Sequence, residues 1–600
     1  MKIKALHKGA ALYYHLLCPI IIFYAMEWLL RNPFHEKWGI KAVLVLVNLV
    51  FFYAVTLFFY ALSGSLRLSL YVVSVSSFLF GLTDYYVYRF RGNTIVPWDF
   101  LSLRTAASVA DNYDYTPEKR VVIASIVFVL LWISIFFCRF KIKEDKKLRT
   151  ALSAGSLVFI LFAYIPFVQS EQTIKNLKVY NKLFTPSTMT MRDGTAFAFI
   201  YDMKFLSVDK PEDYDKDAIR SALYKEYGGD DNERTTADPS TPNIIVIMCE
   251  AFSDPGVVTE FNTNEDFMPF IRSLMEDENV ISGRLHVSVK GGNTPNTEFE
   301  YLTGNSMAFL PQGSIPFQQF VKGPTDAMPS YLEKRGYRSV GMHPYKPKGW
   351  ARNEAYPFLG FKETCFIDYF EKKDPVYIRK YVSDESLFNE IIDMYKENGT
   401  NTPLFSFNVT MQNHSEYSGE FDNFTPDIEV EGLDGTKPIE NYLSLEKLTD
   451  SAFRDFISYF DSINDPTVVV FFGDHQSADH VMEALLKQNG KTGSDLTEEE
   501  NRLRYVVPFL IWANYDIEEK KDLDVSASFL GNLTLEAAGI DITGYRSFLK
   551  EQYDKTPVVS AIHVMKADGT DADTDINDPD LMKYRQYQYY ELFDDDDTLD

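Results

Sequence analysis

The chain has 600 residues, enough for two or more structural units, and a formal net charge of −26. Residues 1–170 hold 18 Lys and Arg against 9 Asp and Glu, whereas the rest hold 41 against 76. A basic apolar front and an acidic remainder predict a membrane domain followed by a soluble one, and the acidity excludes nucleic acid as a partner. Four scattered cysteines exclude a disulfide-stapled fold.

Five apolar stretches are long enough to cross a hydrocarbon core, at about residues 11–30, 40–62, 68–88, 120–138 and 151–169. They follow one another with short links, which favours membrane spans over the buried helices of a soluble protein. No small-residue cleavage site follows the first stretch, so we expect it to be retained as a span. The sequence therefore predicts a five-helix transmembrane domain over residues 1–169.

The positive-inside bias predicts the orientation of these spans. Lysines precede the first span, and six basic residues fill the link between the fourth and the fifth: Arg139, Lys141, Lys143, Lys146, Lys147 and Arg149. Five crossings place both segments on one face and the long C-terminal part on the other. We therefore expect the large domain to be extracytoplasmic.

Residues 170–240 are predicted to form a connector, which ends with the polar run at 228–233. From residue 241 to the end, short runs rich in β-branched or aromatic residues alternate with longer mixed segments. The clearest runs are 244–248, 339–342, 404–409 and 468–472. This alternation predicts an α/β domain over residues 241–600 with a mainly parallel central sheet, in which ligands collect beyond the carboxyl ends of the strands.

Ionisable side chains follow each of these four runs. Glu250 follows the first run and His343 the second, and His414 stands a few residues past the third. Asp474 and His475 follow the fourth. One such residue alone is better explained as the cap of a turn. Together, however, carboxylates and neutral imidazoles predict a site for a divalent cation.

The segment at residues 290–299 contains two glycines, then Thr294, Pro295 and a second threonine, Thr297. Thr294 is a good helix cap and Pro295 suits the first helical position. A hydroxyl at the positive end of a helix and next to a cation could be activated toward phosphorus. This segment taken alone still favours an ordinary capped helix.

Glu250, the Gly-Gly-Asn-Thr-Pro-Asn-Thr-Glu-Phe segment and Gly473-Asp474-His475, behind five spans, resemble the lipoteichoic acid synthase family. Its members carry a sulfatase-like domain of the alkaline phosphatase superfamily. The resemblance implies that Glu250, Thr294, Asp474 and His475 bind manganese. Carboxylates, an imidazole and a hydroxyl are ligand types that also suit magnesium or zinc. It also implies that Thr294 is the nucleophile, which accepts a phosphoglycerol group as a covalent intermediate.

A second group of residues extends the resemblance. His343, Trp350 and Arg352 match a family motif that holds glycerol phosphate, and His414 matches a further substrate-side histidine. Arg352 could grip a phosphate with two parallel hydrogen bonds, while Trp350 is equally well explained as a core aromatic. Asn293 departs from the pattern, because the family often has a lysine before the nucleophile.

The resemblance implies a metal-dependent phosphoglycerol transferase in the cell membrane. Its donor would be phosphatidylglycerol, and its acceptor a glycolipid or a growing polymer of the lipoteichoic acid type. A phosphoethanolamine transferase or a phosphodiesterase on the same scaffold is the alternative enzyme, and a catalytically silent surface binding protein is the alternative outside enzymes. A true sulfatase is disfavoured, because sulfatases usually carry a Cys or Ser, converted to formylglycine, where Thr294 stands.

Overall fold

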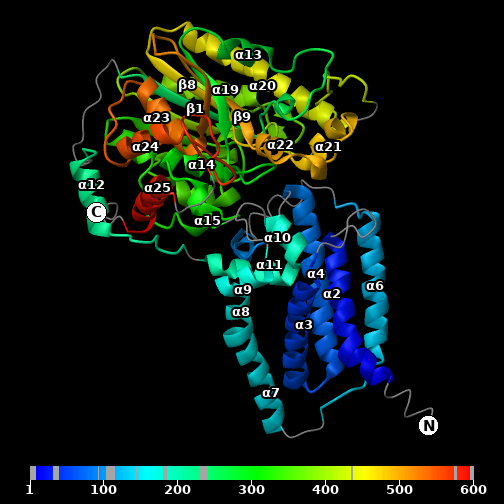
Figure 1. Ribbon diagram of the computed structural model, residues 1–600. Helices are drawn as coiled ribbons and strands as arrows, with labels where there is room; N and C mark the ends of the chain where they lie inside the picture. The colour runs from blue at the N-terminus through cyan, green and yellow to red at the C-terminus, as the bar shows by residue number, and fades with distance from the viewer. Residues whose placement is uncertain are drawn as a thin grey trace, which may run out of the picture. The chain divides into compact units, whose positions relative to one another are not determined.

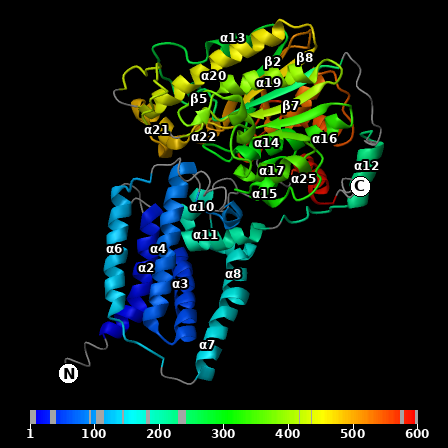
Figure 2. The ribbon, with the colours of Figure 1, turned by 180° about the vertical axis from the view of Figure 1, so that it is seen from behind.

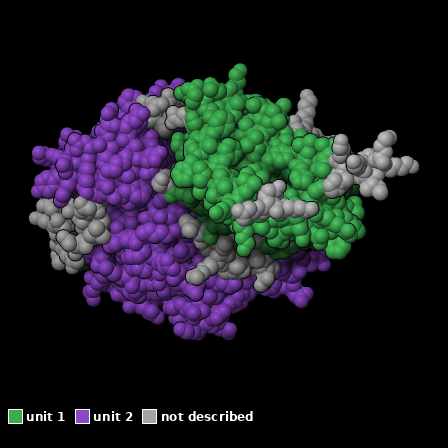
Figure 3. Space-filling model, turned by 90° about the horizontal axis from the view of Figure 1, so that it is seen from below, with its two compact units in different colours: residues 1–100, 114–207, 311–313 green, residues 101–113, 208–310, 314–600 purple. Residues whose placement is uncertain are grey.

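The computed structural model describes residues 9–30, 40–91, 94–102, 115–142, 146–179, 186–206, 208–228, 241–311, 313–415, 417–433, 437–572 and 578–594. The first three lysines and the polar run after residue 228 lie outside these ranges. The chain divides into two compact units, one of residues 1–100, 114–207 and 311–313 and one of residues 101–113, 208–310 and 314–600 (Figure 3).

The first unit contains five helical segments that are long and apolar enough to cross a membrane, which confirms the predicted spans. They cover Gly9–Leu30, Ala42–Ser63, Leu66–Arg89, Lys119–Phe136 and Lys146–Gln169. Figure 1 labels the corresponding helices α2 (Cys18–Leu30), α3 (Ala42–Ser63), α4 (Leu66–Arg91), α6 (Lys119–Phe136), α7 (Lys146–Phe159) and α8 (Ile165–Gln169). Many of their leucines, valines and phenylalanines are exposed, as expected for side chains that face lipid.

Short helices follow the fifth span within the same unit: α9 (Glu171–Leu177), α10 (Pro186–Asp193) and α11 (Thr195–Asp202). The first turn of α11 docks on two polar groups buried among the spans. Thr195 donates both its N–H and its hydroxyl to Glu27, and the N–H of Phe197 donates to Asn48 Oδ1. The free N–H groups of a helix start thus satisfy a carboxylate that would otherwise be costly among apolar helices.

The second unit is built on an eight-stranded sheet in the order β10-β2-β9-β8-β1-β7-β3-β4. The central strands β8, β1, β7, β3 and β4 are all parallel, and β9 runs antiparallel to both β8 and β2. This confirms the predicted mainly parallel sheet. The strands are β1 (Asn243–Cys249), β2 (Val280–His286), β3 (Arg338–Met342), β4 (Glu363–Cys365), β7 (Leu404–Val409), β8 (Thr467–Gly473), β9 (Val506–Ala513) and β10 (Lys520–Ser526).

Alternate side chains of β1 enter two separate cores, one on each face of the sheet. Ile244, Val246 and Met248 belong to one core, and Ile245 and Ile247 belong to the other. Burial on both faces explains why the strand reads as an unbroken apolar run. Figures 1 and 2 show the sheet between two helical layers, with α13, α19 and α20 on one face and α14, α23 and α24 on the other.

The helices of this unit are α12 (Lys216–Lys225), α13 (Pro269–Met275), α14 (Thr294–Thr303), α15 (Pro316–Gln319), α16 (Met328–Glu333), α17 (Arg352–Phe358), α18 (Ile367–Phe370), α19 (Asp384–Asn398), α20 (Lys437–Asp461), α21 (Asp479–Gln488), α22 (Glu498–Leu503), α23 (Ala527–Ala537), α24 (Tyr545–Lys555) and α25 (Pro579–Tyr589). Two two-stranded ribbons complete the unit, β5 (Tyr377–Ile378) with β6 (Tyr381–Val382) and β11 (Val558–Val559) with β12 (Val564–Met565).

Candidate active site

The carboxyl ends of β8, β1, β7 and β3 meet at one edge of the sheet, because these strands are neighbours and parallel. Glu250 follows β1 directly, Asp474 and His475 follow β8, and His343 follows β3. His414 stands five residues past β7. The topology therefore brings the predicted ionisable residues to one edge, the place where α/β sheets hold their ligands.

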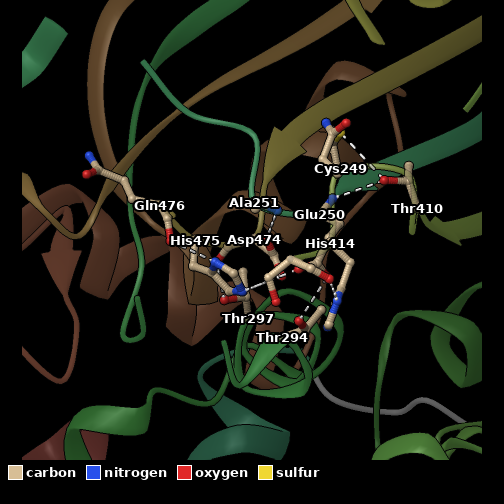
Figure 4. A network of polar contacts seen from close by, with 12 residues as sticks. Cys249, Glu250, Ala251, Thr294, Thr297, Thr410, His414, Asp474, His475 and Gln476 are labelled. Carbon is tan, nitrogen blue, oxygen red and sulfur yellow. Dashed lines mark hydrogen bonds and ion pairs between the residues drawn. The ribbon is translucent and has the colours of Figure 1, made fainter. Parts of the chain in front are cut away.

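Three of these residues form a buried cluster. One ligand atom from each of Glu250, Asp474 and His475 lies within 4.8 Å of the others. His475 Nε2 is 3.2 Å from Asp474 Oδ2 and 3.8 Å from Glu250 Oε1. Figure 4 shows the three side chains converging with Thr294. Burial, reinforced by the charge of Asp474, raises the pKa of Glu250 well above its usual value.

The chemistry of this cluster fits a divalent cation. Asp474 Oδ2 and His475 Nε2 are buried and form no hydrogen bond with any residue that the structure describes. Buried polar atoms without partners are costly, and a cation would supply the missing partner. His475 Nδ1 lies 2.9 Å from the carbonyl oxygen of Gln476, which can only accept, so Nδ1 carries a proton and Nε2 is the ring atom that faces the cluster.

Backbone and hydroxyl groups hold the two carboxylates in place. The N–H of Ala251 donates to Asp474 Oδ1 at 2.7 Å, which ties the end of β1 to the end of β8. The N–H of Glu250 donates to the hydroxyl of Thr410 at 3.0 Å. Ala251 adopts a left-handed conformation with φ 54°. For an alanine this conformation is strained, and such strain is found repeatedly at functional sites.

The glycine-rich segment forms a tight turn that leads into α14. Gly291 and Gly292 have φ values of 65° and 146°, and Asn293 follows at 66°. The N–H of Gly291 donates to the carbonyl of Gln476 at 2.9 Å, and Lys290 Nζ pairs with Asp479 at 2.8 Å. The turn is therefore fastened to the loop that carries Asp474 and His475.

The structure corrects the prediction that Thr294 caps the helix. Asn293 is the cap and Thr294 is the first helical residue, which places Pro295 second. The reason is that Asn293, a residue that tolerates left-handed geometry, completes the turn and lets helical geometry begin at Thr294. Thr294 still lies at the positive end of α14.

The two hydroxyls of this segment point in different directions. Thr294 Oγ1 donates to Glu250 Oε2 at 3.3 Å, whereas Thr297 Oγ1 donates to the backbone carbonyl of Asp474 at 2.8 Å. Both threonines are buried. Only Thr294 therefore faces the carboxylates (Figure 4), while Thr297 holds a loop in place.

Two histidines flank the cluster as neutral bases. His343 Nδ1 lies 3.0 Å from the carbonyl of Val409, and His414 Nδ1 lies 2.8 Å from that of Ser415. Both rings therefore hold their proton on Nδ1. Burial lowers the pKa of His343 well below its usual value, with Arg352 adding to the effect. Burial also lowers the pKa of His414, to about 4, and the positive charge of nearby Arg379 adds to this effect.

Trp350 and Arg352 lie on the loop and helix that follow His343. Trp350 is half-buried with φ 55°, and the next residue, Ala351, has φ 61°. No hydrogen bond or ring contact joins Trp350 to another described site residue. Arg352 begins α17 and is buried, and its charge acts on the pKa of both His343 and Glu250.

The sequence reasoning missed the partner of Arg352. Glu298, which is fully buried, accepts from Arg352 Nε at 3.0 and 3.2 Å through its two oxygens and also from Nη2. Tyr356 donates its hydroxyl to the same carboxylate at 2.6 Å. The Nε and Nη2 groups of Arg352 are thus bound to Glu298, which leaves Nη1 for a ligand. The available signal was spacing, because Glu298 lies four residues after Thr294 on the same helix.

Comparisons with known proteins agree with this geometry. The sulfatase family model matches residues 242–540. A putative cyclic β-1,2-glucan modification protein of Rhizobium meliloti is 28% identical over 486 residues, 78% of this chain and 73% of its own length. Lipoteichoic acid synthase 1 of Bacillus subtilis is 23% identical over 275 residues, 45% of this chain and 41% of its own length.

Among solved structures, phosphoglycerol transferase GacH of Streptococcus pyogenes, in complex with sn-glycerol-1-phosphate, shares the fold. Its TM-score is 0.52 at 22% identity, over 64% of this chain and 95% of that one. The family model, the fold and the five apolar helices all lead to the same assignment. The chain is a multi-pass membrane protein with a C-terminal sulfatase-like domain, and it is similar to lipoteichoic acid synthases.

Proposed function

We propose that this protein is a metal-dependent phosphoglycerol transferase with phosphatidylglycerol as its donor. The observation that carries the proposal is the hydrogen bond from Thr294 to Glu250, at the start of a helix and within a buried cluster of two carboxylates and an imidazole. A hydroxyl in this setting is an activated nucleophile, and the N–H groups of the helix start favour an anion such as a phosphate.

The proposed reaction has two steps. Thr294 Oγ forms a bond to the phosphorus of the donor, the phosphoester bond to diacylglycerol breaks, and diacylglycerol leaves with a proton. An acceptor hydroxyl then attacks the same phosphorus, and Thr294 is released with its proton restored. A divalent cation held by Glu250, Asp474 and His475 would lower the pKa of the hydroxyl and offset charge on the phosphate oxygens. We propose manganese, with magnesium and zinc as alternatives.

The flanking residues would hold the transferred group. Arg352 offers Nη1 to a phosphate oxygen, and the neutral His343 and His414 offer Nε2 to the glycerol hydroxyls. Trp350 would wall the glycerol carbons. Because Thr294 is only 5% exposed, bulk water has little access to the covalent intermediate, which favours transfer over hydrolysis.

The acceptor is proposed to be a sugar hydroxyl of a glycolipid or glycan, or the end of a growing glycerol phosphate polymer. The match to a putative glucan modification protein, over 73% of its length, supports a sugar hydroxyl as the acceptor. The match to a lipoteichoic acid synthase supports the end of a glycerol phosphate polymer as the acceptor. Radiolabelled donor offered with a glycolipid, a cyclic glucan or a glycerol phosphate oligomer would identify the acceptor by the product that carries the label.

The test of the proposal uses the full chain in lipid nanodiscs with labelled phosphatidylglycerol or phosphatidylethanolamine. We expect label transfer from phosphatidylglycerol only, and loss of at least about 10³-fold in Thr294→Ala. Thr297→Ala, which keeps the nucleophile, serves as the control and should retain measurable transfer. Turnover by Thr294→Ala would refute the mechanism, preference for phosphatidylethanolamine would favour the rival transferase, and free glycerol phosphate as the only product would favour a phosphodiesterase.

A further inference from the structure

In the first unit, the link between the fourth and fifth spans packs against the link between the second and third spans, which leads into α4. The N–H of Leu66 donates to the carbonyl of Phe140, and the N–H of Ile142 donates to that of Gly64, both at 3.1 Å. Ser65 and Lys141 form an antiparallel bridge between these hydrogen bonds. These contacts hold the two links together, so the residues of both links form one continuous surface.

This surface encloses a cavity of about 270 Å³, which we call the basic pocket. It is lined by Ser65, Arg67, Leu68, Tyr71, Cys138, Arg139, Phe140 and Lys141. Three of these eight residues are cations and none is acidic. Pockets for drug-sized ligands measure roughly 300 to 1,000 Å³, so the basic pocket, just below that range, suits a small phosphate head group rather than a whole lipid.

The three cations of the basic pocket have no acidic partner among the residues that the structure describes. Arg67 donates Nε to the carbonyl of Cys138 at 2.9 Å, at the end of the fourth span. Within the part of the chain that the structure describes, Arg67, Arg139 and Lys141 form no ion pair. Like charges held around one cavity repel each other, and an anion bound between them would relieve that repulsion.

The position of the basic pocket indicates where the anion comes from. The pocket lies at the ends of two candidate membrane spans, where a bilayer would place its lipid head groups. Leu68 in its wall is 53% exposed, and Phe136 and Phe137 near it are 61% and 64% exposed, which suits contact with acyl chains. Arg67 lies over the ring of Phe136, 5.8 Å from its centroid, so cation and apolar surface adjoin.

We infer that the basic pocket binds the phosphate head group of an anionic phospholipid. Basic pockets between transmembrane helices recognise such head groups through several cations around one phosphate, with the chains lying on the neighbouring apolar surface. The site is separate from the nucleophile cluster, belongs to the other unit and does not depend on the proposed reaction. Its ligand would stay bound rather than be consumed.

Native mass spectrometry of the full chain, released from nanodiscs of phosphatidylserine or phosphatidylcholine, tests this inference. Phosphatidylserine is not the proposed donor, so the result is independent of the transferase proposal. We expect the wild type to retain phosphatidylserine but not phosphatidylcholine. The double substitution of Arg139→Gln and Lys141→Gln should weaken retention, by about fivefold for each cation removed.

The matched control is the double substitution of Lys146→Gln and Lys147→Gln, which removes the same charge from the same link but from outside the pocket. The four replaced side chains are exposed, so both variants should keep the melting temperature of the wild type. Equal loss in both variants would overturn the inference in favour of diffuse surface charge. Retention of soluble glycerol phosphate in place of the lipid would overturn the assignment to a membrane ligand.

Discussion

At the scale of single residues, the pair of Glu298 and Arg352 links the helix of the proposed nucleophile to the proposed phosphate-binding side of the site. Glu298 lies one turn after Thr294 on α14, and both of its oxygens accept from Arg352. Two bonds from one carboxylate fix the plane of the guanidinium group. The position of Arg352 is therefore set relative to Thr294, although the two residues lie on different helices.

Glu298→Gln tests this linkage. The amide keeps the size of the side chain but loses the charge and one acceptor, so Arg352 should become less well oriented. We expect kcat/KM to fall by about tenfold or more, mainly through a higher KM for the donor, since breaking a buried pair costs several kcal/mol. Tyr356→Phe removes only one neutral donor and should cost about 1 kcal/mol. A lower melting temperature with unchanged KM would indicate a merely structural pair.

Glu300, two residues further on α14, gives a pH-dependent prediction. Burial raises its pKa from 4.5 to about 8, although Ser288 and the N–H of Met307 donate to it. Because the folded protein binds this proton more tightly than the unfolded chain, its contribution to stability is complete below pH 4.5 and is lost as the pH rises through 8.

In Glu300→Gln that loss should disappear. We expect the melting temperature of the full chain to fall less between pH 5 and pH 9 in the variant than in the wild type, as measured by differential scanning calorimetry. Parallel curves for the two proteins would show that Glu300 is already ionised in the folded state.

At the scale of elements, Gly473 at the end of β8 shows how a strand places the residues after it. A Cβ atom on Gly473 would stand 1.9 Å from the carbonyl oxygen of Phe252, a backbone atom with little room to move. Glycine is therefore required where β8 passes the loop after Glu250. This close approach brings Asp474 and His475 to Glu250.

Gly473→Ala should push these two loops apart. We expect a loss of about 1–3 kcal/mol in the free energy of unfolding, and weaker binding of Mn²⁺ measured by calorimetric titration. Gly493→Ala is the matched control, because no atom lies within 4 Å of the added Cβ, and it should stay within about 0.5 kcal/mol. Equal behaviour of the two variants would contradict this role for Gly473.

The elements also show how far the sequence alone leads. The four predicted strands are confirmed, and burial on both faces explains the unbroken apolar runs of β1 and β8. Val506–Ala513 has the same composition yet runs antiparallel to β8, and no local pattern encodes direction. The pairing of Glu298 with Arg352 joins positions 54 residues apart, and the helix start moved because Asn293 adopts left-handed geometry. Contacts and dihedral angles of this kind arise only in the folded chain.

At the scale of the whole molecule, one chain combines five apolar helices with an acidic sulfatase-like unit. In the proposed reaction the donor is a lipid, so attachment to the membrane keeps the active site beside its substrate. Glu250, Asp474 and His475 all belong to the second unit. We therefore expect a divalent cation to change the thermal stability of the second unit and not that of the first.

Removal of divalent cations from the full chain with a chelator should therefore lower the melting transition of the second unit. Adding Mn²⁺ at about 100 times its dissociation constant should restore about 2.7 kcal/mol. Asp474→Asn should abolish this response, whereas Asp393→Asn, an exposed acid outside the cluster, should leave it intact. A transition insensitive to the chelator, or an unchanged response in Asp474→Asn, would argue against a cation at this cluster.

In the proposed reaction, Thr294 carries the phosphoglycerol group between donor and acceptor. Mass spectrometry of peptides from the full chain, after exposure to phosphatidylglycerol and Mn²⁺ without acceptor, tests it most directly. We predict a glycerol phosphate adduct on Thr294 that disappears when acceptor is added. An adduct on Thr297 or on a histidine, or an unmodified Thr294 in a preparation that turns over its donor, would contradict it.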